Sequence, residues 1–170
     1  MSGVPAVLVN PGRRPAPPPD DAWRAPGRFH RRLPGYARTR LVAAPALATE
    51  LGTASLWIKD ESTRLGLPAY KILGASWATY RMLTTRLGVE PTWSTVDELR
   101  SALAPLGQMT LVAATDGNHG RAVARVARWF GYRALILVPR GTADARIAAI
   151  RGEGAAVTVV PGCYDDAVAE

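Results

Sequence analysis

Short continuous apolar runs alternate with runs at helical spacing from residue 55 onward. Continuous apolar runs of a few residues are typical of buried strands, and apolar spacings of three and four are typical of helices. The strands that this pattern predicts lie at 55–59, 109–114, 134–138 and 156–160. The helices that it predicts lie at 70–87, 96–103, 118–130 and 142–152, with a last helix that begins at 165.

The residues at the ends of these helices are those that helix ends favour. Ser94 or Thr95, and Thr142, can cap helix starts through their hydroxyl groups. Gly131 and Gly152 stand where a terminating glycine is expected. Strands and helices that alternate in this order are the pattern of βαβ units, so we expect an α/β fold with a parallel sheet.

Residues 1–40 differ from the rest, because they hold eight of the fourteen prolines. Proline removes a hydrogen-bond donor and fixes φ, so we expect an arm without regular structure apart from short polyproline turns. His30, within this arm, needs no role. Residues 41–170 are expected to carry the folded domain, with Trp57 and Trp77 in its core.

The net charge of +7 is concentrated in the arm. Residues 1–40 contain eight arginines and two aspartates, which leaves the other 130 residues close to neutral at +1. A nearly neutral domain has no basic face for nucleic acid, so no specific nucleic-acid partner is predicted, and the arm is interpreted as a solvated tail. There is no apolar run long enough for a membrane span and no recognisable signal peptide, so a cytoplasmic protein is expected. Cys163 is the single cysteine, which excludes an internal disulfide.

Lysine is scarce, since Lys59 and Lys71 are the only two in the chain. Lys71 stands at the start of an expected helix, where the positive end of the helix dipole disfavours an ammonium and favours a neutral amine. Schiff-base formation with a carbonyl group needs such an amine. From spacing alone, the simpler interpretation is a surface lysine in a first helical turn.

A glycine-containing turn, TDGNHG at 115–120, follows an expected strand and leads into an expected helix. Its backbone amides face the carboxyl edge of the sheet, which is where open α/β sheets bind ligands. Asn118 can donate to an oxygen anion, and Gly117 and Gly120 permit a close backbone approach. The alternative is an ordinary turn with Asn118 as the helix cap. The turn lacks the G-x-G-x-x-G pattern, so no dinucleotide site is predicted.

Together the two segments resemble the paired motifs of fold-type-II pyridoxal-phosphate enzymes, such as threonine and serine dehydratases, cysteine synthase and tryptophan synthase β. In that group a small–aromatic–lysine motif precedes a glycine, like AYK at 69–71 with Gly74. An asparagine loop follows some tens of residues later, like GNHG at 117–120. The resemblance implies a parallel three-layer αβα sheet of the tryptophan synthase β-like fold.

Further residues are similar to diaminopropionate ammonia-lyase in particular. They are KDES at 59–62, Arg64, GL at 66–67, DGNHGR at 116–121 and YDDAV at 164–168. The departures are small: Tyr70 replaces the usual phenylalanine, Pro68 replaces a polar residue, and Cys163 precedes the last motif. The resemblance covers residues 41–170, and it also implies that part of the preceding arm packs along the body of the protein.

The resemblance implies pyridoxal 5′-phosphate as the cofactor, carried by Lys71, and no metal. It implies a β-elimination on a small amino acid, with 2,3-diaminopropionate converted to pyruvate and ammonia. Lys71 and Asp116 are the implied catalytic residues, and the alternative for Asp116 is a structural role in the turn. Asn118 is implied to hold the 3′-oxygen of the cofactor, with Gly117 beside it.

Members of this family are longer, and their glycine-rich phosphate-binding loop lies beyond the last residue of this chain. The sequence is therefore interpreted as a truncated or split N-terminal portion of a catalytic domain, inactive alone. Its expected partners are the missing C-terminal half or further copies of itself. Two alternatives stay open: an inactive remnant or partner-binding fragment, and a serine/threonine dehydratase-like enzyme.

Overall fold

The structure is a computed structural model that describes residues 21–115, 117–162 and 164–169. No helix among these residues has the length and apolar character needed to cross a membrane. The elements in chain order are α1 (Asp21–His30), β1 (Leu41–Ala43), α2 (Pro45–Glu50), β2 (Trp57–Lys59), α3 (Lys71–Leu87), α4 (Val96–Leu103), a 3₁₀ turn (Ala104–Leu106), β3 (Thr110–Ala114), α5 (Asn118–Phe130), β4 (Arg133–Pro139), α6 (Asp144–Gly152), β5 (Ala156–Val160) and α7 (Tyr164–Ala169).

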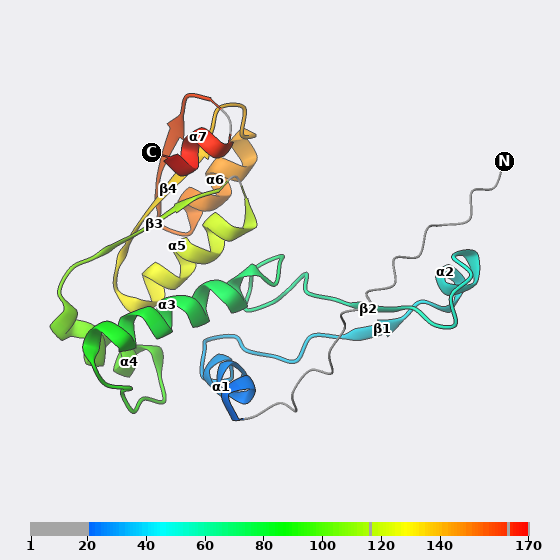
Figure 1. Ribbon diagram of the computed structural model, residues 1–170, viewed down its shortest axis with the longest axis horizontal. Coiled ribbons are helices and arrows are strands. Elements are labelled where there is room, and N and C mark those ends of the chain that lie inside the picture. Colours follow the sequence, from blue (N-terminus) through cyan, green and yellow to red (C-terminus); the bar gives the residue numbers. More distant parts are fainter. Residues whose placement is uncertain (1–20, 116, 163, 170) are drawn as a thin grey trace, which may run out of the picture.

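Strands β3, β4 and β5 form a parallel sheet in that order. Val112 of β3 lies opposite Leu135 of β4, and Leu137 of β4 lies opposite Thr158 of β5. Helix α5 connects the first pair of strands and α6 connects the second. Figure 1 shows these helices beside the sheet, and the arrangement confirms the α/β fold with a parallel sheet.

Helices contact both faces of this sheet, as the αβα expectation requires. Because side chains alternate along a strand, Ile136 and Val138 of β4 point to one face and Leu135 and Leu137 to the other. The first pair belongs to the main core, together with Val126 of α5. The second pair belongs to a smaller cluster on the face where α7 contacts β3 and β4.

Helix α3 presents the apolar stripe that its spacing predicted. Tyr80 and Leu83 are fully buried, and Tyr80 stacks on Trp77 with ring centroids 5.7 Å apart. Helix α4 begins with a capping box, in which the Thr95 hydroxyl accepts from the Glu98 amide and the Glu98 carboxylate accepts from the Thr95 amide. Propensity, capping and burial therefore agree over this part of the chain.

The expectation that residues 1–40 lack regular structure is wrong for residues 21–30, which form α1 despite Pro26 inside the helix. Phe29 and Leu33 are 1% and 3% exposed and pack into the main core. The buried His30 ring shares a hydrogen bond of 2.9 Å between Nε2 and the Leu73 carbonyl. Burial against α3 thus outweighs the low helix propensity of the segment. The expectation for residues 1–20 lies outside the described residues.

Strand β2 differs from the buried strand expected at 55–59. It pairs antiparallel with β1, and all three of its residues are exposed. Trp57, expected in the core, is 58% exposed, whereas Trp77 packs against the main core. The β1–β2 ribbon and α2 extend away from the rest of the chain in Figure 1. An apolar run predicts a strand that is suited to burial, but it does not specify which segment covers the strand.

Candidate active site

Lys71 is the first residue of α3. Its helix begins without a side-chain cap, because the N-cap residue Tyr70 has helical dihedral angles and makes no cap hydrogen bond. The Lys71 amine is exposed and lies 5.0 Å from the centroid of the Tyr70 ring. The structure therefore confirms that this lysine lies at a helix start, and its side chain is accessible.

The loop before Lys71 is held by a partly buried ion pair between Arg64 and Glu61. Arg64, 7% exposed, donates from Nε to Glu61 at 2.5 Å and from Nη2 to the same carboxylate at 2.7 Å. It also donates to the Ala37 carbonyl and the Thr39 hydroxyl. The Arg64 hydrogen bond is the main reason that the pKa of Glu61 falls to about 2. The pair ties this loop to the segment that precedes β1.

Asn118 is the first residue of α5, directly after strand β3 and the turn. The N-cap is Gly117, in an extended conformation with no side-chain cap bond. The interpretation of Asn118 as a helix cap is therefore wrong, since Gly117 occupies that position. The Asn118 side chain is exposed at the carboxyl edge of the sheet. Its amide is thus available to a ligand.

Both segments border one pocket of about 820 Å³. Lys71 contributes from the start of α3, and Gly117 and Asn118 contribute from the start of α5. The size is typical of a site for a small molecule or cofactor, which occupies roughly 300–1,000 Å³. The pocket lies at the carboxyl edge of the parallel strands, where this class of sheet binds ligands. Lys71 and Asn118, which are 47 positions apart in the sequence, therefore border the same cavity.

Cationic side chains surround the same pocket. Arg121 of α5 and Arg146 of α6 line it. His119, also in the wall, has its pKa lowered by burial and by the charge of Lys71. Arg121 donates to Glu153 at 3.2 Å, and its Nε is buried without a hydrogen-bond partner among the described residues. The two arginines and two helix N-termini favour an anionic ligand.

Sequence reasoning assigned no role to seven of the ten described lining residues, among them Arg121, Arg146 and Tyr164. Arg121 stands one helical turn after Asn118, so the helical period alone could have placed it on the same face. Arg146 and Tyr164 come from α6 and α7, and only the packing of those helices brings them to the pocket. Asp116, predicted as a catalytic residue, lies outside the described residues.

The two glycines of the turn differ in their surroundings. A Cβ atom on Gly117 would meet nothing within 4 Å, so the pocket side of this residue is open. A Cβ atom on Gly120 would lie 2.9 Å from Ile136 Cγ2, 3.0 Å from Thr115 Cγ2 and 3.3 Å from Ile150 Cδ1. Gly120 therefore lets α5 approach β4 and α6, and its role is in packing.

We expect Gly120→Ala to lower the free energy of unfolding by about 1 to 3 kcal/mol, because β-branched core side chains would have to move. The matched control is Gly74→Ala in α3, where a Cβ would meet nothing within 4 Å. That change should raise stability by up to about 1 kcal/mol, through helix propensity. Urea unfolding of both variants measures the difference. Equal effects at the two positions would contradict the packing role of Gly120.

Comparisons with known proteins agree with this geometry. Residues 32–170 match the family model described as "Pyridoxal-phosphate dependent enzyme". The chain is 38% identical over 140 residues to diaminopropionate ammonia-lyase of Escherichia coli K12, which covers 82% of this chain. It is 34% identical over 80 residues to the biosynthetic L-threonine dehydratase of the same strain, which covers 43% of this chain and 16% of that protein.

A solved structure gives the same result in three dimensions. The holo form of diaminopropionate ammonia lyase from Escherichia coli superposes with a TM-score of 0.78 at 36% identity. The superposition covers 86% of this chain and 37% of that one. The chain spans only 35% of the length of the curated ammonia-lyase that it matches.

Proposed function

The chain belongs to the family of pyridoxal-phosphate dependent enzymes, and from this membership we propose that it is the portion of an ammonia-lyase that carries the cofactor lysine. The observation that carries the proposal is the meeting of Lys71 and Asn118 at one pocket. The reaction is the β-elimination of ammonia from a small amino acid, and the proposed substrate is 2,3-diaminopropionate. The β-amino group leaves as ammonia, and water then hydrolyses the remaining enamine to pyruvate and a second ammonia.

The residues around the pocket fit the cofactor. The Lys71 amine would hold its aldehyde carbon, and the Asn118 amide would hold its 3′-oxygen. Arg121 and Arg146 line the pocket, and their positive charge suits an anionic group. When bound, pyridoxal phosphate supplies an electron sink for the pair released from the substrate α-carbon.

Side chains of this chain are proposed to transfer the protons in the reaction. We propose that Lys71 Nζ accepts the α-proton on one face of the substrate. Asp116 is proposed to donate a proton to the leaving β-amino group, which departs as ammonia. Arg121 and Arg146 keep the pocket cationic toward the substrate carboxylate.

The exposed apolar surface supports a partner for this chain. Leu41, Trp57 and Ile58 on the β1–β2 ribbon are 60%, 58% and 48% exposed. Val112 on β3 and Val159 on β5 are 59% and 48% exposed, at the two edges of the sheet. Parallel sheets are normally covered on both faces, and open strand edges pair readily. We propose that a polypeptide like the remaining two thirds of the relatives covers these surfaces.

The test mixes the purified chain with an Escherichia coli ammonia-lyase that lacks its matched segment, in the presence of pyridoxal phosphate. We expect no ammonia release from diaminopropionate by the chain alone, and release by the mixture. Turnover by the chain alone that Lys71→Ala abolishes would show that no partner is needed. Association without turnover would favour a partner-binding fragment that is not an enzyme.

The same assay with L-serine and L-threonine separates a second candidate. The match to L-threonine dehydratase favours hydroxyamino acids as alternative substrates. Faster ammonia release from these than from diaminopropionate would replace the proposed substrate and keep the reaction class.

A further inference from the structure

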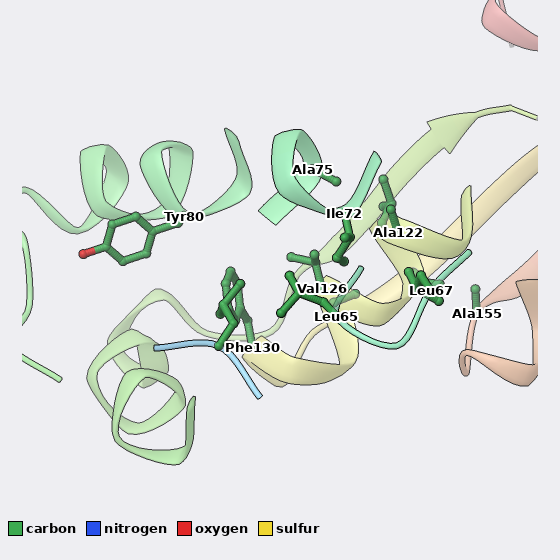
Figure 2. Close-up of a cluster of buried hydrophobic side chains, with 14 of the residues drawn as sticks. Leu65, Leu67, Ile72, Ala75, Tyr80, Ala122, Val126, Phe130 and Ala155 are labelled. Carbon is green, nitrogen blue, oxygen red and sulfur yellow. The ribbon is translucent and has the colours of Figure 1, made fainter. Parts of the chain in front are cut away.

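The loop that leads to Lys71 contains a leucine in an unusual backbone conformation. Leu65 has φ of 52°, the only positive value at a non-glycine residue in the described ranges. A leucine enters this left-handed region only when its surroundings hold it there. Leu65 and Leu67 are each 3% exposed, and Figure 2 shows them in the core near Val126 and Ala122. The loop is therefore anchored in the body of the protein.

Arg125 of α5 holds the backbone of this loop. Its Nη1 donates to the Leu65 carbonyl at 3.2 Å. Its Nε and Nη2 donate to the two oxygens of Glu153, at 2.5 Å and 3.0 Å. One guanidinium thus spans the end of α6 and the loop before Lys71. A bidentate pair fixes the plane of the guanidinium, so the third nitrogen has a defined direction toward the loop.

Glu153 is the buried centre of this arrangement. It is the C-cap residue of α6 and is 5% exposed. Burial alone would raise its pKa, but the guanidinium groups of Arg125 and Arg121 outweigh that effect and hold the pKa below its usual value. Arg128 adds a longer hydrogen bond of 3.4 Å. The ionised carboxylate therefore orients Arg125 toward the loop and Arg121 toward the pocket wall.

We propose that Glu153 and Arg125 are positioning residues that fix the loop before Lys71 and so place its amine at the pocket. The inference rests on the proposed role of Lys71 as the cofactor-bearing lysine. Covalent capture requires the amine to meet a bound aldehyde at a defined place, and small displacements of a reacting group lower rates steeply. Arg125 contacts the loop and Glu153 fixes the orientation of Arg125, so this ion pair would control that placement.

The two lysines of the chain provide an internal reference for the test. The full chain is incubated with pyridoxal phosphate and reduced with borohydride, and peptide mapping gives the ratio of label on Lys71 to label on Lys59. We expect Lys71 to dominate in the wild type. In Arg125→Gln and in Glu153→Gln the ratio should fall by about tenfold, because the hydrogen bond that fixes the loop at the Leu65 carbonyl is lost or misdirected.

Arg128→Gln is the matched control. It removes an arginine from the same helix and a hydrogen bond from the same carboxylate, but its side chain makes no described hydrogen bond to the loop. Its label ratio should equal that of the wild type, even if its melting temperature falls. All variants are labelled well below their melting temperatures, as followed by circular dichroism. A purely structural role would lower melting temperatures without moving the ratio.

Arg125→Lys covers the case in which Arg125→Gln does not fold. Lysine keeps the charge beside Glu153 but cannot reproduce the rigid fork that reaches both Glu153 and Leu65, so the ratio should fall here too. Folded Arg125 variants with the wild-type ratio would overturn the positioning role. A wild type without preference for Lys71 would overturn the proposed function, and this inference with it.

Discussion

Lys71→Ala is expected to abolish ammonia release by the assembled enzyme, with a loss of roughly four orders of magnitude or more. The amine is proposed both to hold the cofactor and to move the α-proton, so its removal affects every step that depends on either role. The measurement is the initial rate with diaminopropionate and saturating pyridoxal phosphate. Borohydride labelling of the same variant should leave no modified peptide from the start of α3.

Lys59→Arg is the matched control for Lys71. Lys59 lies on β2, where its amine donates to the Thr39 carbonyl and pairs with Glu61 at 3.5 Å. Arginine keeps this ion pair and removes the only other lysine of the chain. We expect wild-type turnover and wild-type labelling of Lys71. Predominant labelling of Lys59 in the wild-type chain would contradict the assignment of Lys71 as the cofactor lysine.

Asp116→Asn is expected to lower the elimination rate by about two to four orders of magnitude, the usual contribution of a positioned acid or base. The amide keeps the size of the side chain and removes its ability to move a proton. Labelling of Lys71 should be unchanged, because the cofactor is proposed to be held by Lys71 and Asn118. A lowered elimination rate with unchanged labelling of Lys71 would therefore support the proposed role of Asp116.

Asp97→Asn provides the control for this second experiment. Asp97 lies in the first turn of α4, with a side chain that is 86% exposed and paired with Arg100. Its neutralisation should leave the rate unchanged. An Asp116→Asn enzyme with the wild-type rate would reduce Asp116 to a turn residue.

The sequence by itself determined the central elements and the two motifs. The helix predicted at 118–130 is α5, and the strand predicted at 156–160 is β5, with identical bounds. Helix α5 buries a regular apolar stripe, and β5 is a short apolar run that pairs with the strand before it, so the local pattern already contains the signal. The local order of strand, turn and helix also put Lys71 and Asn118 at helix starts. Their catalytic and binding roles stay predictions.

Only the tertiary structure decided how distant segments meet. Helix α1 forms because Phe29 has a buried site beside Trp77 and Tyr80, which no local pattern reveals. Arg146 reaches the pocket because α6 packs beside α5, and Arg125 contacts Leu65 across 60 positions. Contacts of this kind depend on the path of the whole chain. Propensity and periodicity describe a residue's near neighbours, whereas a buried charge or a pocket wall is defined by atoms that only folding brings together.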